Sequence, residues 1–260
     1  MKQDAIDSFV SDGYLRLDGA FPRELADEMR AILWHEMGLD PNDRTAWKQP
    51  VVRLGGHAEP PFVAASNTPA LHAAFDALVG PGHWAPLMGL GTFPVRFPSP
   101  ADPGDAGWHI DVSFASDGDD PNDFLGYRAN VNSKGRALLA LFLLSDVDER
   151  NAPTRIRAGS HLDIARRLEP AGERGMTLRE LAANDFAESR DRPVHLATGE
   201  AGTVYLCHPF LVHAAQPHHG TEPRFIAQPP VYPKAPPSLD RADGDYSPVE
   251  RAIRLGLGRE

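Results

Sequence analysis

Proline and glycine punctuate this chain throughout, with 25 prolines and 23 glycines among 260 residues. Because proline lacks a backbone donor and both residues favour chain reversals, this density leaves room for few long helices. Ala137 to Leu144 is continuously apolar, as expected of a strand buried on both faces. These features predict a mainly β fold, a two-sheet jelly roll or barrel with helices packed outside it. Strands are expected over residues 14–17, 93–97, 111–114, 137–144, 154–157, 203–212 and 224–232.

Helical spacing of apolar residues is clearest near the start of the chain. It predicts helices over residues 4–12, 22–37 and 69–79, whereas residues 40–65 are polar, lack a period and indicate a loop or lid. We expect one domain over residues 1–260, with a helical part over about 1–85, a jelly-roll core over about 86–232, an inserted helix and loop at 163–192, and a loosely ordered tail over 233–260.

Charge and composition narrow the class of protein. A net charge of −10 and a pI near 5.5 argue against nucleic acid or an anionic membrane as a partner, since both require a basic face. The sequence contains no apolar stretch of about 18 residues, and its acidic start is unlike a secretory signal. A single cysteine excludes an intrachain disulfide and a cysteine-rich metal site. We therefore expect a cytoplasmic protein that acts on a small molecule.

His109 and Asp111 are separated by one residue. On a strand, residues two apart point to the same side, so both side chains can face one metal ion while Ile110 faces the core. His213 follows the apolar stretch 203–212. Two imidazoles and one carboxylate form the facial triad that holds Fe(II) in non-haem oxygenases and leaves the opposite coordination face open.

Other assignments stay open at this point. His208 and His161 are alternative third ligands, although strand parity sends His208 to the face opposite His213, and His161 is expected to close a strand after a tight turn. An isolated His-x-Asp also occurs as a surface histidine beside a capping aspartate. Zinc is the competing metal, but structural zinc sites prefer four ligands, usually with cysteine, and Cys207 stands alone.

Arg224 follows His213 by a turn and opens the apolar stretch Phe225-Ile226-Ala227. We expect this stretch to be a strand paired with the one that ends at His213. A guanidinium so close to a barrel interior requires an anionic partner, and its planar fork matches a carboxylate with two parallel hydrogen bonds. A dicarboxylate co-substrate would provide that partner.

Several segments together resemble the phytanoyl-CoA dioxygenase family of Fe(II)/2-oxoglutarate oxygenases, over about residues 3–232. The opening stretch Phe9 to Leu15 is similar to the first helix and strand of that family. The segments that carry the resemblance are His109-x-Asp111, Asn151 to Arg155, Gly159-Ser160-His161, Gly199 to Gly202, His208 to His213, and Arg224.

The resemblance implies a double-stranded β-helix, the cupin-like jelly roll, and a chemistry that uses Fe(II), 2-oxoglutarate and O₂. It implies that His109, Asp111 and His213 are the iron ligands and that Arg224 binds the distal carboxylate of 2-oxoglutarate. Two further residues match family positions that contact the co-substrate, namely Thr154 and Arg96.

Three departures from the family pattern stand out. The serine that often follows the last ligand by two residues is Ala215 here, which removes one hydrogen bond to the co-substrate. The asparagine usual after Gly-Pro is replaced around residues 216–219, and Gly-Pro-Thr becomes Ala-Pro-Thr at 152–154.

Asp111 also bears on the reaction. Halogenating relatives replace this carboxylate with a small residue, so the resemblance implies hydroxylation, desaturation or oxidative cyclisation of a small-molecule metabolite, in natural-product or secondary metabolism. The polar segment 115–136 is expected to line the substrate entrance. The alternative is a non-redox, metal-binding protein of cupin-like fold, either an isomerase or a ligand-binding module, which would have no use for Arg224 and Thr154 as co-substrate contacts.

Overall fold

The structure, a computed structural model, describes residues 1–116 and 118–259. Residue 117, within the segment 115–136, lies outside the described residues. The strands are β1 (Tyr14–Leu17), β2 (Val51–Leu54), β3 (Phe93–Arg96), β4 (Arg128–Ala129), β5 (Leu138–Leu143), β6 (Thr154–Arg157), β7 (Met176–Thr177), β8 (Val194–Ala197), β9 (Val204–Cys207), β10 (His213–Ala214), β11 (Ile226–Ala227) and β12 (Pro230–Val231). The α-helices are α1 (Gln3–Asp12), α2 (Arg23–Met37), α3 (Pro60–Ser66), α4 (Pro69–Val79), α5 (Ser160–Leu168), α6 (Leu178–Ala182) and α7 (Pro248–Gly256), and short 3₁₀ turns lie at Arg44–Ala46, Phe124–Gly126, Glu169–Arg174 and Ala187–Ser189.

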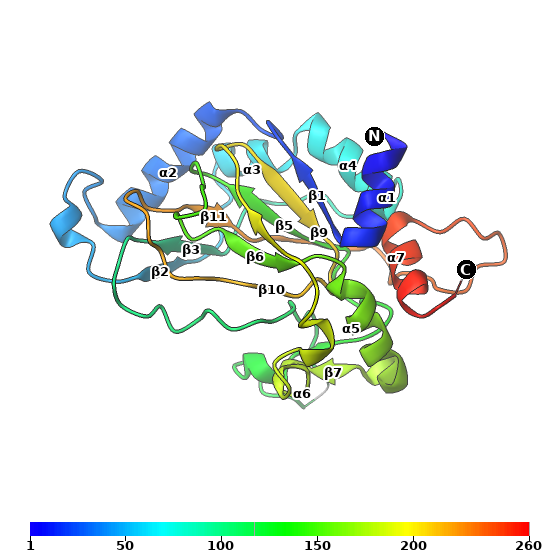
Figure 1. The fold of residues 1–260 in the computed structure, drawn as a ribbon. Coiled ribbons are helices and arrows are strands. Elements are labelled where there is room, and N and C mark those ends of the chain that lie inside the picture. The colour runs from blue at the N-terminus through cyan, green and yellow to red at the C-terminus, as the bar shows by residue number, and fades with distance from the viewer. Residues whose placement is uncertain (117, 260) are drawn as a thin grey trace.

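Two antiparallel sheets form the centre of the molecule. In the larger sheet β1, β9, β5 and β11 lie side by side, with β12 also paired to β5, and in the smaller sheet β6 lies between β10 and β8. Figure 1 shows helices α1 to α4 along the outer side of the larger sheet and strands β6 and β10 on its other side. Two further, two-stranded sheets are formed by β2 with β3 and by β4 with β7.

Strand β5 is buried on both faces, as its continuous apolar sequence predicts. Alternate residues Leu138, Ala140 and Phe142 belong to the core beneath the helices. The intervening residues, Leu139, Leu141 and Leu143, belong to a second core that includes residues of β6, β8 and β9. One strand therefore separates the helical layer from the interior of the sandwich.

The expectation of a mainly β chain is wrong, because helices occupy more of the described residues than strands do. The supposed loop at residues 40–65 contains β2, paired with β3, and α3, whose prolines occupy its first turn where a missing N–H costs nothing. The supposedly loose tail contains α7, which packs against α1, α4 and α5. Its start has a capping box between Ser247 and Glu250, a sequence signal that the expectation overlooked.

The expected strand over residues 203–212 is also wrong in an instructive way. It breaks after Cys207, because His208 and Pro209 form a turn in which the Leu211 N–H donates to the His208 carbonyl at 2.9 Å. The chain thereby leaves the larger sheet as β9 and enters the smaller sheet as β10. Strand 224–232 likewise becomes β11 and β12, and both pair with β5 rather than with the strand that bears His213.

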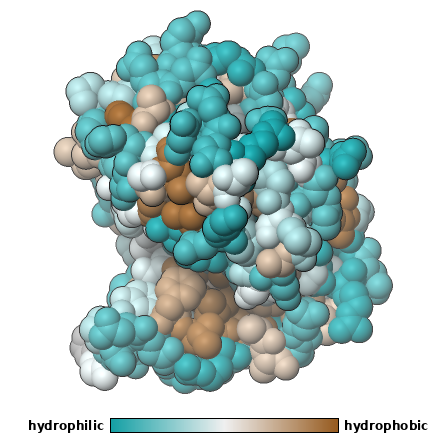
Figure 2. Space-filling model, turned by 90° about the vertical axis from the view of Figure 1, so that its left-hand side faces the viewer, coloured by the Kyte–Doolittle hydropathy of each residue, from teal (hydrophilic) through white to brown (hydrophobic). Residues whose placement is uncertain are grey.

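The face of the molecule shown in Figure 2 is hollowed, and hydrophobic residues gather in the hollow while the surrounding surface is mostly hydrophilic. Within residues 1–116 and 118–259, none of the helices combines the length and apolar character required to cross a membrane.

Candidate active site

His109 and His213 are brought together by the backbone. Each donates its N–H to the carbonyl of the other at 2.9 Å, forming a single β-bridge. The strand expected over residues 111–114 is not formed among the described residues there, and the backbone of the His109 segment meets β10 through this bridge. The two rings lie with their centroids 4.4 Å apart.

Both histidines are held in the same tautomeric arrangement. Nδ1 of His109 lies 3.0 Å from the Gly107 carbonyl, and Nδ1 of His213 lies 3.0 Å from the Leu211 carbonyl. Because a carbonyl only accepts, each Nδ1 carries the proton and each Nε2 keeps a free lone pair. This is the arrangement that metal-binding histidines adopt, with the second ring nitrogen oriented by the protein.

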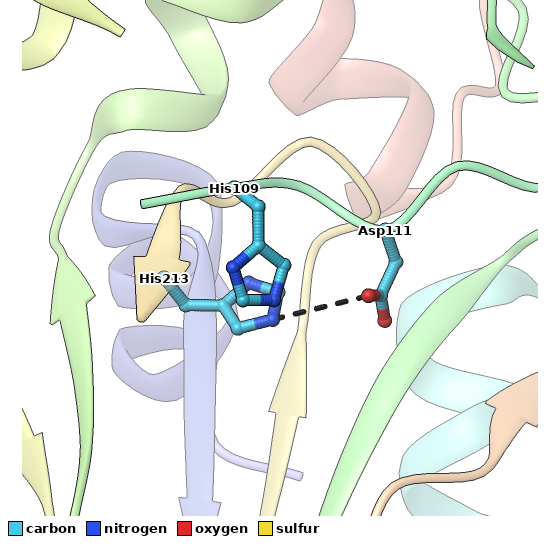
Figure 3. Close-up of side chains that lie close together, drawn as sticks. All are labelled: His109, Asp111 and His213. Carbon is cyan, nitrogen blue, oxygen red and sulfur yellow. Dashed lines mark ion pairs between the residues drawn. The ribbon is translucent and has the colours of Figure 1, made fainter. Parts of the chain in front are cut away.

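Asp111 completes a group of three possible ligand atoms that all lie within 4.8 Å of one another (Figure 3). Its Oδ1 is 4.0 Å from Nε2 of His213, and its Oδ2 is 3.4 Å from Nη1 of Arg136. Burial acts to raise the pKa of Asp111, but electrostatic interactions with Arg136 first, and then with His213 and His109, hold it below its ordinary value. Burial, reinforced by the neighbouring His109, lowers the pKa of His213 to about 4. Neutral imidazoles with an ionised carboxylate are the donor set suited to Fe(II).

A cavity of about 170 Å³ adjoins this triad, and His109, His213 and Arg224 all line it. Arg224 is 1% exposed, and its guanidinium donates to the carbonyls of Ala152 and, at 3.3 Å, Pro94. Among the described residues no carboxylate forms an ion pair with it, and its Nε has no partner. Burial and the charge of Arg96 lower the pKa of Arg224 to about 9, which still leaves the group charged at neutral pH.

A buried cation without a counter-ion is costly, so this cavity is built for an anion. Thr154 and Ala215 also line it, and Ala215 offers no hydroxyl there. Arg96 lines the cavity as well, but Asp105 already binds its Nη2, with both carboxylate oxygens at 2.6 Å. Asp105 pairs with Arg53 too. The structure thus leaves Arg224 as the less satisfied of the two buried arginines.

His161 and His208 lie together elsewhere. Their ring centroids are 4.8 Å apart, and His161 is in α5 rather than at the end of a strand, as the sequence had suggested. Neither joins a group of three possible metal ligands among the described residues.

A larger cavity of about 580 Å³ borders Asp111 from another side. Gln228 lines both this cavity and the smaller one, and Arg136 lines the larger one beside Asp111. Arg136 ends the segment 115–136 that was expected to line the substrate entrance, although the sequence did not single it out, and Gln228 was missed. Gln228 had no signal in the sequence, because its position depends on the break between β11 and β12, where its N–H donates to the Thr92 carbonyl at 3.0 Å.

Arg155 in β6 was also missed, and it joins the two segments that carry the histidines. Its Nη2 donates to the Ala106 carbonyl at 2.7 Å and to the Ala215 carbonyl at 2.8 Å. Its guanidinium carbon lies 4.7 Å from the centre of the Trp108 ring, next to His109. Arg155 therefore holds the spacing between the His109 segment and β10.

Solved structures with this fold were found by structural comparison. HygX from Streptomyces hygroscopicus, solved with nickel, 2-oxoglutarate and hygromycin B, superposes with a TM-score of 0.56 at 15% identity over 90% of this chain and 88% of that one. The carbocyclase SnoK of nogalamycin biosynthesis superposes with a TM-score of 0.56 at 15% identity, over 90% of this chain and 85% of SnoK. The epimerase SnoN, solved with Fe³⁺, α-ketoglutarate and nogalamycin RO, superposes with a TM-score of 0.57 at 17% identity, over 90% of this chain and 83% of SnoN. These similarities confirm the cupin-like fold.

No curated protein sequence matches this chain. The family model described as phytanoyl-CoA dioxygenase matches residues 9–226, which is most of the chain and contains the triad and Arg224. The chain therefore belongs to the phytanoyl-CoA dioxygenase family and is a 2-oxoglutarate-dependent, non-haem iron dioxygenase.

Proposed function

We propose that His109, Asp111 and His213 are the ligands of the Fe(II) ion, and that Arg224 binds the distal carboxylate of 2-oxoglutarate. One observation carries the proposal: the buried guanidinium of Arg224, which has no carboxylate partner among residues 1–116 and 118–259, lines the same cavity as the two histidines. Thr154 supports the co-substrate from the same cavity. Arg96 contributes to co-substrate binding through its positive charge, because Asp105 already forms a hydrogen bond with its Nη2.

When bound, iron supplies the positions at which 2-oxoglutarate and O₂ are activated for oxidation of the substrate. The protein supplies geometry and exclusion of water. The Gly107 and Leu211 carbonyls fix the two imidazoles, and Arg136 neutralises the outer oxygen of Asp111. Arg224, which lines the same small cavity as His109 and His213, would hold the distal carboxylate of the co-substrate through its fork.

We propose that the substrate is a small-molecule metabolite of natural-product or secondary metabolism, oxidised by hydroxylation, desaturation or ring closure. Three enzymes that share the fold support this range: HygX binds hygromycin B, SnoN binds nogalamycin RO, and SnoK is a carbocyclase. With Asp111 as the third protein ligand, no coordination position would remain for a halide once 2-oxoglutarate is bound, which disfavours halogenation. We further propose that residues 1–260 act as a single domain in the cytoplasm.

The test is anaerobic purification, reconstitution with Fe(II), and measurement of succinate across a metabolite panel after O₂ is admitted, with products identified by mass spectrometry in chloride-rich buffer. We expect succinate in step with an oxygenated, unsaturated or cyclised product. A chlorinated main product, or product formation without succinate, would contradict the proposal.

A further inference from the structure

The larger cavity beside Asp111 has a distinctive wall. Its volume of about 580 Å³ is within the range that holds drug-sized ligands. Part of the lining is bare backbone, where His57 and Leu90 are paired by two hydrogen bonds of 2.8 and 2.9 Å. A Cβ on Gly89 would lie 2.0 Å from the His57 carbonyl oxygen, and one on Gly91 would lie 2.6 Å from the Gly56 Cα, so side chains are excluded there. The two glycines therefore let the backbone segments 56–57 and 89–91 pack directly against each other in this wall.

Large apolar side chains stand exposed at the same cavity. Met88 is 83% exposed, Phe124 57% and Tyr232 55%, and they come from three separate segments of the chain. Solvent-exposed apolar groups gathered from distant segments around one cavity indicate an apolar ligand.

Arg136 is the one guanidinium or ammonium group among the described residues of this lining. Its contacts are long, at 3.4 Å to Asp111 and 3.4 Å to the Val112 carbonyl, and its buried Nε has no partner. His57, in contrast, has its ring nitrogens beside the carboxylates of Glu36, at 2.6 Å, and Glu59, at 3.1 Å. Arg136 is thus the group with unused capacity to receive a ligand.

We propose that this cavity takes an apolar, ring-containing metabolite that carries one acidic oxygen, and that Arg136 receives this oxygen beside the metal site. The inference rests on the proposed function and adds the class of its substrate. A guanidinium donates to an anionic oxygen more strongly than to a neutral one, so the charge state of the ligand controls binding.

The same lining disfavours two other classes. A coenzyme A thioester carries several phosphates, and one arginine is too few to bind them. A polyamine or aminoglycoside would need several carboxylates. Among the described residues of the lining there is one carboxylate, that of Asp111, and it belongs to the triad.

The test uses three matched fluorescent probes: 9-anthracenecarboxylate, 9-anthracenemethanol and 9-anthracenemethylammonium. Each is titrated into the protein in the presence of Zn(II) and 2-oxoglutarate, which occupy the triad and the small cavity without turnover. We expect the carboxylate to bind at least about tenfold more tightly than the alcohol, and the ammonium to bind most weakly. Equal or tighter binding of the alcohol or the ammonium would overturn the inference.

Variants of two residues locate the probe. Arg136→Met should lower the affinity of the carboxylate probe to that of the alcohol probe and leave the affinity of the alcohol probe unchanged. Arg136→Lys should keep most of the preference for the carboxylate probe. Phe124→Ala should weaken all three probes, whereas Leu125→Ala is the matched control, since Leu125 is 48% exposed in the same turn but does not line the cavity. An undiminished preference in Arg136→Met, or equal effects of the two alanine variants, would overturn the inference.

The outcome is separable from that of the proposed function. Failure to bind Fe(II) and 2-oxoglutarate in direct titrations would remove the proposed function, while the Arg136 dependence of probe binding would still report on the cavity. Normal binding of Fe(II) and 2-oxoglutarate together with a preference for the cationic probe would remove the substrate class alone.

Discussion

Two pairs of closely spaced histidines in this protein look alike at first sight, although His109 is only half-buried. His109 and His213 have ring centroids 4.4 Å apart, and His161 and His208 have ring centroids 4.8 Å apart. Burial lowers the pKa of both His213 and His161 to about 4. The difference lies in what surrounds the rings. The first pair has Asp111 within 4.8 Å and lines the smaller cavity, and Asp111 borders the larger one. The second pair is enclosed between α1, α5 and the turn after β9.

The hydrogen bonds of the second pair also differ. Nε2 of His161 is bound to the Val10 carbonyl at 3.1 Å, and Nδ1 of His208 accepts the Phe210 N–H at 3.2 Å. These bonds fix local structure and do not aim two lone pairs at one point. Two close imidazoles therefore become a candidate metal site only when backbone acceptors orient both and a carboxylate and an open cavity complete the set.

The largest expected effect concerns metal binding. His213→Ala, His109→Ala or Asp111→Ala should abolish measurable Fe(II) binding, because each removes one of three ligands, whereas His208→Ala should retain it. Anaerobic calorimetric titration measures this directly. If His208→Ala lost iron while His213→Ala kept it, the assignment of the two pairs would be reversed.

The second effect concerns the cavity beside the first pair. Arg224→Met should raise the KM for 2-oxoglutarate by an amount equivalent to about 2–5 kcal/mol, since a buried charge-assisted contact to a carboxylate is lost. The affinity for Fe(II) in the absence of co-substrate should stay nearly constant. Arg224→Lys should recover part of the loss, because it keeps the charge without the fork. An unchanged dependence on 2-oxoglutarate in Arg224→Met would remove the main support for the co-substrate role.

The third effect concerns acid stability and the second pair. His161 has a pKa of about 4 in the folded protein and 6.5 ordinarily, with Arg192 and Asp163 nearby. The unfolded chain therefore binds a proton first as the pH falls, so His161 by itself lowers the free energy of unfolding between about pH 6.5 and pH 4, by roughly 3 kcal/mol. Urea unfolding of the metal-free protein across this range measures the loss. His161→Gln, which keeps a hydrogen-bond donor for the Val10 carbonyl, should show a flatter dependence of the unfolding free energy on pH. An equally steep dependence in this variant would show that His161 is not the origin of the loss.

The smallest effect concerns a position where the chain departs from its family. Ala215 lines the small cavity without a hydroxyl. Ala215→Ser should lower the KM for 2-oxoglutarate by a few-fold, equivalent to about 1 kcal/mol for one added hydrogen bond. Steady-state kinetics measures the KM of this variant. Ala215→Val is the control, because valine adds bulk without a hydrogen-bond donor. A KM lowered equally by valine would assign the effect to packing.

The local elements followed from the sequence where neighbouring residues decide the structure. Helix α4 matches its expected range, and α1 ends at Gly13, whose positive φ of 83° suits glycine. A Cβ at Gly13 would also lie 2.4 Å from Nδ1 of His161, a constraint that only the folded chain reveals. The apolar run of β5 predicted burial on both faces for the same local reason.

The composition of the candidate site was also readable, because the spacing of His109 and Asp111 and the late His213 and Arg224 form a distinctive chemical set. The tertiary structure decided how that set is assembled. A turn at Pro209 moves the chain between sheets, a single β-bridge replaces the expected strand at His109, and β11 pairs with β5. Pairing partners, cavities and the roles of Arg136 and Gln228 depend on contacts between residues distant in the chain, and such contacts leave no periodic trace in the sequence.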